Sequence, residues 1–208
     1  MLDSTSSSHR HVFIVDDDVQ TLRAFARILH IEGFEVDTFH SASEFLQHRP
    51  SSDVPSCLVL DLKLPEIDGL QLQQLMRSAR VDMPIIFVSG YGDVPSTASA
   101  MRFGAVDFLE KPVEDSRLLD AVSNAVALDA ERRGRRRDIE DARQLLARLT
   151  PRERQVCELV ARGLLNKQIA DEIGASERTV KIHRARALQK LGVLSITDLV
   201  RLLSRLGE

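Results

Sequence analysis

Short apolar runs alternate with longer amphipathic segments along the first half of the chain. Runs of four or five apolar residues predict β-strands, and apolar residues repeated every three or four positions predict helices. The predicted strands cover residues 11–15, 36–39, 57–60, 84–88 and 106–109. Strand and helix in alternation are typical of a parallel sheet with helices on both faces, so we predict a doubly wound, five-stranded α/β domain.

The segments between these strands have helical patterns with recognisable ends. The predicted helices are 19–32, which stops before Gly33, one beginning near Ser43, 69–80, and one between Pro95 and Phe103. A glycine directly after a helical pattern is a common C-terminal cap. A long helix is predicted to start near Ser116, and its apolar stripe weakens after Leu128. The segment up to residue 148 is then either a solvated helical linker or a mobile tether.

The last sixty residues read as helices throughout. Thr150, Pro151 and Glu153 form a strong start signal, with threonine as N-cap, proline at the first helical position and glutamate completing a capping box. Further helices are predicted over 166–173, from Ser176 to Lys190, and from residue 195 onward. We therefore expect a small all-α domain after the α/β domain.

Polar residues stand directly after four of the predicted strands. They are the pair Asp16 and Asp17, then Asp61, Ser89 and Lys111. Because parallel strands end at one edge of their sheet, we expect these side chains to meet over one crevice. Taken singly, each has a plainer interpretation as a helix cap, a turn residue or a solvated charge, but their coincidence at four strand ends favours a site.

The predicted carboxylate cluster suits a magnesium ion and phosphoryl transfer. Clustered carboxylates repel one another, and Mg²⁺, which prefers oxygen ligands, removes that repulsion. A carboxylate in such a site can attack phosphorus, since the metal ion and a nearby lysine neutralise the charge of the transferred group. Asp61 stands alone after the central strand, so we assign it as the nucleophile, and we assign Asp16 and Asp17 to hold the metal ion.

Residues 11 to about 127 resemble the receiver domain of two-component systems. The stretches VFIVDDD, LVLDLKLPEIDG, IIFVSGYGDVP and GAVDFLEKP match the receiver pattern in order and spacing. The resemblance implies a flavodoxin-like fold, and it implies that Asp61 accepts a phosphoryl group from a sensor histidine kinase.

The same resemblance assigns the other groups of the site. The implied metal ligands are Asp17, Asp61 and the backbone carbonyl of Lys63, with Asp16 acting mainly through water. The residues implied to respond to phosphorylation are Ser89 and Lys111, which contact the phosphoryl group, and Phe108, the rotating aromatic residue of the switch.

The chain departs from the receiver pattern at three positions. Ser89 stands where many receivers have threonine, and the hydroxyl contact is expected to survive because only a methyl group is missing. Asp18 adds a third acidic residue to the pair, and we expect a solvated loop carboxylate. Val113 replaces a frequent phenylalanine, which changes packing and not chemistry. The sequence does not decide whether the Lys111–Pro112 bond is cis, as in that family.

A phosphatase of the haloacid dehalogenase kind is an alternative, because it also uses an aspartyl nucleophile and Mg²⁺. Such an enzyme needs a second acid two residues after the nucleophile to protonate the leaving group, and Lys63 occupies that place. We therefore expect no enzyme activity beyond the receiver's own phosphoryl transfer and slow autodephosphorylation.

Two helical segments joined at Gly174 predict a helix-turn-helix, whose second helix enters the major groove of DNA. The outer face of that helix carries Arg178, Lys181, Arg184 and Arg186, and its inner face carries Val180, Ala187, Leu188 and Leu191. Arginine and lysine both anchor phosphates and read guanine edges. The alternative is a small helical bundle with a basic, solvated face.

Residues 149 to about 206 resemble the LuxR-type helix-turn-helix, through the elements TPRE, NKQIA and TVKIH. Nearly the whole chain is then similar to response regulators of the FixJ and NarL kind, and its GYGDVP stretch favours FixJ. The residues that the resemblance places at the DNA surface are Lys167, Arg178, Thr179, Lys181, Ile182, Arg184 and Arg186. Leu165 stands where a polar residue is frequent, which removes one candidate contact.

Charge is divided unevenly along the chain. Residues 1–127 carry 10 basic and 19 acidic side chains, net −9, and residues 128–208 carry 18 and 12, net +6. This division is expected if only the second half meets a polyanion. We predict a disordered tail over 1–10, a receiver domain over 11–127, a linker over 128–148 and a DNA-binding domain over 149–208.

No apolar run approaches the roughly 20 residues of a membrane span, and the serine-rich start lacks the features of a signal peptide. We therefore expect a cytoplasmic protein without a membrane partner. Cys57 and Cys157 lie inside apolar patterns in different halves, so we expect buried thiols rather than a disulfide or a metal pair.

Together these features predict a transcription regulator that phosphorylation of Asp61 controls. Capture of the phosphoryl group by Lys111 and Ser89 is expected to let Phe108 turn inward and to change the nearby surface. The expected partners are a sensor histidine kinase, promoter DNA, RNA polymerase and a second copy of the phosphorylated chain. The remaining alternative is a constitutive DNA binder whose receiver serves only as a dimerisation scaffold.

Overall fold

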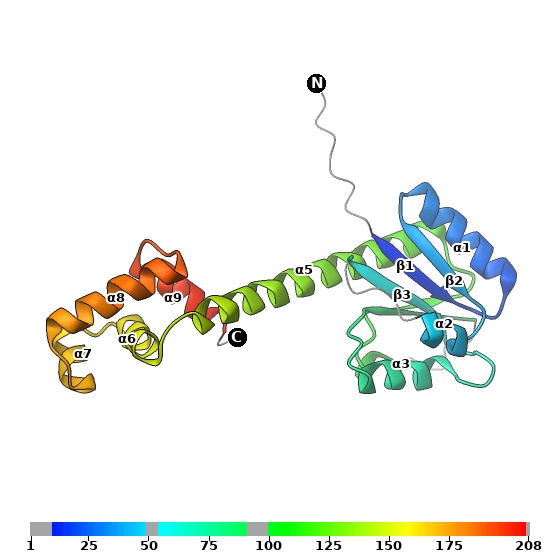
Figure 1. Ribbon diagram of the computed structural model, residues 1–208. Helices are drawn as coiled ribbons and strands as arrows, with labels where there is room; N and C mark the ends of the chain where they lie inside the picture. Colours follow the sequence, from blue (N-terminus) through cyan, green and yellow to red (C-terminus); the bar gives the residue numbers. More distant parts are fainter. Residues whose placement is uncertain (1–9, 49–53, 91–99, 207–208) are drawn as a thin grey trace, which may run out of the picture. The chain divides into compact units, whose positions relative to one another are not determined.

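The computed structural model describes residues 10–48, 54–90 and 100–206, and Figure 1 labels its elements. The chain divides into two compact units, Met1–Arg133 and Gly134–Glu208. The predicted tail and the predicted helix between Pro95 and Phe103 fall largely outside the described residues. In the part of the chain that the structure describes, no helix is long and apolar enough to cross a membrane.

The first unit is built on a five-stranded parallel sheet in the order β2-β1-β3-β4-β5. The strands are β1 (His11–Val15), β2 (Glu35–Phe39), β3 (Ser56–Asp61), β4 (Ile85–Ser89) and β5 (Asp107–Glu110). This confirms the predicted doubly wound α/β fold. Asp61 and Ser89 prove to be the last residues of their strands, so the sheet itself holds their backbones.

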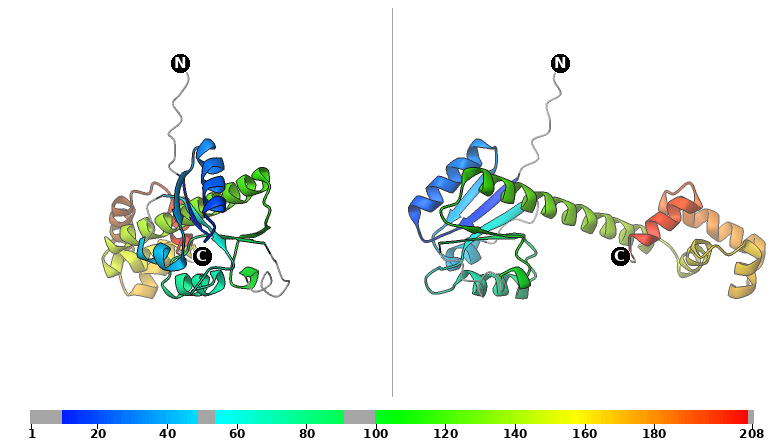
Figure 2. Two further views of the ribbon diagram at one scale, coloured as in Figure 1. Left: turned by 90° about the vertical axis from the view of Figure 1, so that its right-hand side faces the viewer. Right: turned by 180° about the vertical axis from the view of Figure 1, so that it is seen from behind.

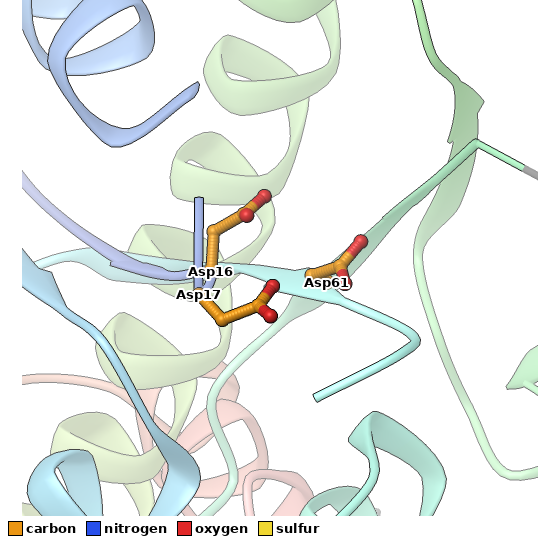
Figure 3. Close-up of side chains that lie close together, drawn as sticks. All are labelled: Asp16, Asp17 and Asp61. Atoms are coloured by element: carbon orange, nitrogen blue, oxygen red, sulfur yellow. The ribbon is translucent and has the colours of Figure 1, made fainter. Parts of the chain in front are cut away.

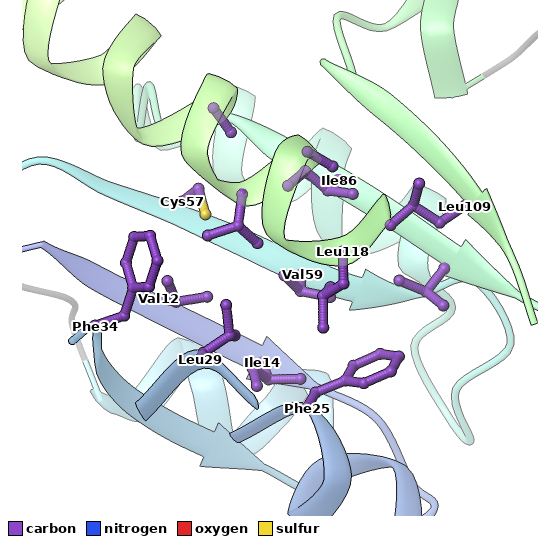
Figure 4. Packing of buried hydrophobic residues seen from close by; sticks show 14 of the residues in the cluster. Val12, Ile14, Phe25, Leu29, Phe34, Cys57, Val59, Ile86, Leu109 and Leu118 are labelled. Carbon is purple, nitrogen blue, oxygen red and sulfur yellow. The ribbon is translucent and has the colours of Figure 1, made fainter. Parts of the chain in front are cut away.

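Two apolar clusters cover the two faces of this sheet. Helix α1 (Val19–Ile31) and the first turns of α5 (Asp115–Ala147) lie on one face, and α2 (Ala42–His48) and α3 (Gly69–Ser78) lie on the other (Figure 2). Successive residues of β1 alternate between them, with Val12 and Ile14 in the cluster drawn in Figure 4 and Phe13 and Val15 in the other. Burial on both faces explains why these strands appear in the sequence as unbroken apolar runs.

Helix α5 continues past the predicted receiver boundary at residue 127 without a break. Its residue Asp129 is fully buried and accepts hydrogen bonds from the backbone N–H of Ser56, at 2.8 Å, and from Nε of Arg133, at 2.5 Å. These bonds hold the helix against the beginning of β3. The sequence left open whether the segment after Leu128 is a helical linker or a mobile tether. In the structure it is helical up to Ala147.

The second unit consists of the end of α5 and four short helices, as the sequence predicted. They are α6 (Pro151–Ala161), α7 (Asn166–Ile173), α8 (Glu177–Leu191) and α9 (Ile196–Ser204). The predicted capping box between Thr150 and Glu153 is present, with Pro151 at the first helical position. Gly174 ends α7 in the left-handed conformation, with φ of 64°, which glycine adopts at little cost.

Both cysteines are buried free thiols, as expected. Burial raises the pKa of Cys57, and it raises the pKa of Cys157 to about 11. Both side chains therefore stay neutral and pack as small apolar groups.

Glu153 joins the start of α6 to the end of α8. Its side chain is buried and accepts hydrogen bonds from Nζ of Lys190, at 2.7 Å, and from the backbone N–H of Thr150, at 2.9 Å. The bond from Lys190 is the larger cause that lowers the pKa of Glu153 from 4.5 to about 2. The ionised carboxylate is thus part of the folded second unit.

A glycine at the start of α3 sets how closely this helix approaches the end of β3. A Cβ atom on Gly69 would lie 2.5 Å from the backbone oxygen of Asp61 and 2.9 Å from Cε1 of Phe87. We expect Gly69→Ala to lower the free energy of unfolding by about 1–3 kcal/mol, because buried backbone must move. Thermal and denaturant unfolding of the full chain will measure this change.

Gly134 provides the matched control, because it lies inside α5 and a Cβ atom there would meet nothing within 4 Å. We expect Gly134→Ala to raise stability by about 0.5–1 kcal/mol, since alanine loses less conformational entropy in a helix. Equal stability of the two variants would contradict the close approach at Gly69.

The stabilisation from Glu153 is expected to depend on pH in a defined direction. Because the folded state lowers its pKa, the contribution is complete above about 4.5 and disappears as the pH falls toward about 2. Glu153→Gln should therefore destabilise the second unit near neutral pH, and the difference from the natural chain should shrink in acid. Denaturant unfolding between pH 7 and pH 3 measures this difference in stability. The control is Glu158→Gln, which removes an exposed carboxylate that lies 3.2 Å from Arg154.

Candidate functional site

Three carboxylates meet where β1 and β3 end. Asp16 and Asp17 follow β1 directly and Asp61 ends β3, and one oxygen of each lies within 4.8 Å of the others (Figure 3). Asp16 and Asp61 are buried, and Asp17 is exposed. The parallel register brings the strand ends to one edge of the sheet, which we call the carboxyl edge. The predicted convergence of these residues is therefore present in the structure.

Lys111 lies between two of these carboxylates. Its Nζ atom is 2.6 Å from Oδ2 of Asp16 and 3.1 Å from Oδ1 of Asp61. The residue follows β5, and its backbone N–H donates to the carbonyl oxygen of Ser89 at 2.9 Å. The Lys111–Pro112 peptide bond is cis. One ammonium group thus contacts both buried carboxylates and supplies a single positive charge to the pair.

The ionisation of Asp61 and Lys111 reflects burial and pairing together. Burial raises the pKa of Asp61, and the hydrogen bond and charge of Lys111 offset only part of this effect. Burial on its own lowers the pKa of Lys111, but hydrogen bonds to Asp16 and Asp61 outweigh it and raise the pKa. The lysine therefore keeps its positive charge, while the Asp61 carboxylate is incompletely compensated and suited to react with an electrophile.

The loop after β3 holds the second oxygen of Asp61. The backbone N–H of Lys63 donates to Oδ2 of Asp61 at 3.1 Å, and the N–H of Gly69 donates to the carbonyl of Leu62 at 3.0 Å. Asp68 then caps α3 through a capping box with Gln71. Both Asp61 oxygens therefore have a donor, which fixes the orientation of the carboxylate.

Asp18, the third acidic residue of the run, has a different task. It is the N-cap of α1, and it accepts hydrogen bonds from the hydroxyl of Thr21 and the backbone N–H groups of Gln20 and Thr21. These bonds lower the pKa of Asp18, the largest effect coming from the Thr21 hydroxyl. The residue is exposed, as expected, and its oxygens serve the helix start rather than the acidic cluster.

Ser89 and Phe108 lie on β4 and β5, the two strands that follow β3 toward one side of the sheet. Ser89 is the buried last residue of β4, one position beyond Val88, which pairs with Asp61. Phe108 belongs to β5, where it pairs with Phe87 and packs, partly buried, against the cluster under α2 and α3. The structure places a hydroxyl and an aromatic ring on neighbouring strands at the predicted end of the sheet.

Helix α8 carries most of the predicted DNA contacts on its outer face. Val180, Ala187 and Leu191 are buried in the core of the second unit, as predicted, and Leu188 packs against that core. The predicted contact residues that are exposed are Lys167 on α7 and Arg178, Lys181, Ile182 and Arg186 on α8.

The other two predicted contact residues are half-buried and have partners inside the unit. The Thr179 hydroxyl lies 2.8 Å from Oγ of Ser176 at the start of α8. Arg184 donates from Nη1 to Oδ1 of Asn166, the first residue of α7, at 3.3 Å. The sequence pattern gave no signal for the Asn166 contact, because the two residues lie on different helices and only the tertiary fold joins them.

Comparison with known proteins gives the same division of the chain. The model of the response regulator receiver domain matches residues 12–123, and that of the luxR family of bacterial regulatory proteins matches residues 147–203. The chain is 44% identical over 202 residues to nodulation protein W of Bradyrhizobium diazoefficiens, covering 97% of this chain and 88% of that protein. It is 40% identical over 197 residues to the response regulator protein TodT of Pseudomonas putida, covering 95% and 86%.

A solved structure, that of the response regulator StyR, aligns with a TM-score of 0.85 at 44% identity and covers 95% of this chain and 99% of that one. The two family models cover both units, and the relatives span both of them with few residues left over. This family consists of transcription factors and not of enzymes in the usual sense. The chain belongs to the response regulators of two-component systems, as a member with a LuxR-type DNA-binding domain.

Proposed function

We propose that a sensor histidine kinase phosphorylates Asp61 and that this modification controls promoter binding by α8. The observation that carries the proposal is the contact of Asp61 with Lys111, 3.1 Å, beside Asp16 and Asp17 at the carboxyl edge. A receiver domain implies a kinase partner, and a LuxR-type domain implies DNA binding.

The acidic cluster fits Mg²⁺ by the chemistry of its donors. The proposed ligands are oxygens of Asp16, Asp17 and Asp61 and the backbone carbonyl of Lys63, with Asp16 acting mainly through water. These are the hard oxygen donors that Mg²⁺ prefers, and the exposed Asp17 lies on the solvent side of the cluster. The bound ion would supply positive charge beside the transferred phosphoryl group.

In the proposed reaction, an oxygen of Asp61 attacks the phosphorus atom of a phosphohistidine. An O–P bond forms while the N–P bond breaks, and the histidine nitrogen leaves with the electron pair. Lys111 holds positive charge at the oxygen that reacts, and the N–H of Lys63 holds the other oxygen in place. Hydrolysis of the product returns Asp61 to its carboxylate form.

The proposed switch begins with competition for Lys111. A phosphoryl group adds about −1.5 to −2 charge at Asp61, which favours Lys111 leaving Asp16 for the new oxygens. The Ser89 hydroxyl then donates to the phosphoryl group, and Phe108 turns inward. The surface around β5 and the first turns of α5 changes, and a second copy of the phosphorylated chain binds there.

The proposed DNA surface is the outer face of α8 together with Lys167 at the start of α7. The residues proposed to contact bases or phosphates are Lys167, Arg178, Thr179, Lys181, Ile182, Arg184 and Arg186. Lys181 and Ile182 are exposed, and their place in the LuxR-type motif assigns them to bases. The bond of Arg184 to Asn166 favours a fixed phosphate contact. We place the protein in the cytoplasm, where promoter DNA and RNA polymerase are available to it.

Replacement of Asp61 should separate this mechanism from constitutive DNA binding. With Mg²⁺ and radiolabelled acetyl phosphate, the natural chain should become labelled and bind promoter fragments at least tenfold more tightly. Asp61→Asn should show neither effect, because the amide lacks the nucleophilic oxygen. Asp18→Asn is the matched control, since asparagine also caps helices and the residue lies outside the cluster. An unchanged response of Asp61→Asn would favour the receiver as a mere scaffold.

Replacement of Lys181 should test the DNA surface. Because the lysine is proposed to meet a base, Lys181→Ala should weaken binding to a promoter fragment and leave the slope of log affinity against log salt unchanged. A decrease of about 0.9 in the magnitude of that slope would instead indicate a phosphate contact. Arg201→Ala removes the same charge from α9, outside the proposed surface, and should leave both quantities unchanged. Measurements of fluorescence anisotropy at several salt concentrations provide them.

A further inference from the structure

The first unit contains a cavity at the end of the sheet opposite to Asp61. It has a volume of about 310 Å³ and lies beside Ile85, the first residue of β4, whereas Asp61 is the last residue of the parallel strand β3. The end of α3, the loop that follows it and the residues before β5 form its walls. This volume is at the lower end of the range for pockets that bind small molecules, about 300–1,000 Å³.

Gln73, one of the residues that line the cavity, carries a buried hydrogen-bond acceptor. Gln73 is 4% exposed, and its Nε2 donates to the carbonyl of Ala100 at 3.4 Å. Its Oε1 has no hydrogen-bond partner among the described residues. If the amide nitrogen and oxygen of Gln73 were exchanged, the amide oxygen would face the carbonyl oxygen of Ala100. The contact with Ala100 therefore identifies which of the two atoms is the oxygen. A buried carbonyl oxygen of this kind is stabilised by a ligand that donates to it.

Positive charge gathers at the same cavity, although residues 1–127 carry a net charge of −9. Arg77, Arg80 and Arg132 line it. Arg132 pairs with Asp82 at 3.3 Å, and no ion pair within the described residues includes Arg77 or Arg80. Two guanidinium groups are therefore available to an anion.

Arg80 occupies a backbone position that normally belongs to glycine. The N–H of Arg80 bonds to the carbonyl of Arg77 at 3.0 Å, and the N–H of Val81 bonds to that of Met76 at 2.9 Å. This is the Schellman pattern that ends many helices, and its left-handed residue is usually glycine. Arg80 adopts it with φ of 57°, which is strained for a residue with a Cβ atom. Strained residues of this kind often serve a binding site.

The remaining walls of the cavity are largely apolar. Met76, Met83 and Ile85 are buried, and Phe103 is 37% exposed at the rim. An anion with a purely polar body, such as inorganic phosphate, would leave these side chains without contacts. A ligand with a flat apolar body would cover them.

We propose that this cavity binds a small aromatic carboxylate that also carries a hydroxyl group. The carboxylate pairs with Arg77 and Arg80. The Gln73 side chain gives up its 3.4 Å bond to Ala100 and turns toward the ligand, whose hydroxyl group donates to Oε1. The ring packs against Phe103 and the buried methionine side chains. The cavity shares no residue with the acidic cluster, so this site is distinct from the proposed phosphorylation site.

Calorimetric titration of the full chain, without phosphodonor, tests the site. The probes are the three hydroxybenzoate isomers, benzoate without the hydroxyl group, 4-hydroxybenzyl alcohol without the carboxylate, and inorganic phosphate without the ring. At least one hydroxybenzoate isomer should bind ten or more times more tightly than benzoate, 4-hydroxybenzyl alcohol and inorganic phosphate. Absence of binding by every isomer at millimolar concentration, or equal binding of phosphate, would overturn the proposal.

Arg80→Gly separates binding from folding. Glycine suits the left-handed backbone, so the unfolding temperature should stay equal or rise, while affinity for the preferred isomer falls at least tenfold. Arg27→Gln removes an exposed arginine from α1, away from the cavity, and should leave affinity unchanged. Gln73→Leu should abolish the difference between the preferred isomer and benzoate. Unchanged affinity in Arg80→Gly would contradict the assigned site.

Discussion

The compensation of buried negative charge by Lys111 is the constraint on which the carboxyl edge depends. Asp16 and Asp61 are 2% and 6% exposed, and two ionised carboxylates so placed would repel each other in surroundings that solvate them poorly. The lysine supplies the one cation that contacts both, at 2.6 and 3.1 Å, among the described residues. Because Asp16 and Lys111 directly follow β1 and β5 and Asp61 is the last residue of β3, these ion pairs also fix the strand ends relative to one another.

The same contact makes the edge responsive to chemistry at Asp61. Nζ of Lys111 contacts both Asp16 and Asp61. If Asp61 gained negative charge, the ammonium group would be attracted more strongly to Asp61 than to Asp16. The proposed motion of the Lys111 side chain needs no unfolding, because the backbone N–H of Lys111 is bonded to the carbonyl of Ser89 and need not move with the ammonium group. In the proposed switch, a charge change at Asp61 would therefore reach β5, the strand that directly precedes Lys111 and carries Phe108.

The sequence predicted the sheet and the approach of its polar ends because both follow from local pattern. Apolar runs locate the strands, and parallel order then requires Asp16, Asp61 and Lys111 to meet. The buried contacts of Asp129 with Ser56 and of Glu153 with Lys190 could not be predicted, because a charged residue in a helical pattern is usually solvated. Nor could the sequence decide between linker and tether, since Gly134 disfavours helix, whereas α5 continues through it to Ala147.

These buried carboxylates share one physical role. Asp129 fixes α5 to the beginning of β3, the strand that ends in Asp61, and Glu153 fixes the end of α8, the helix that carries the proposed DNA contacts. Burying a charge adds little net stability even when it is paired, but leaving it unpaired is costly. Such contacts therefore favour the helix position in which the charge is paired over positions in which it is not. The positions of the elements that bear the proposed function are therefore set by hydrogen-bonded charges, while the apolar clusters supply the stability.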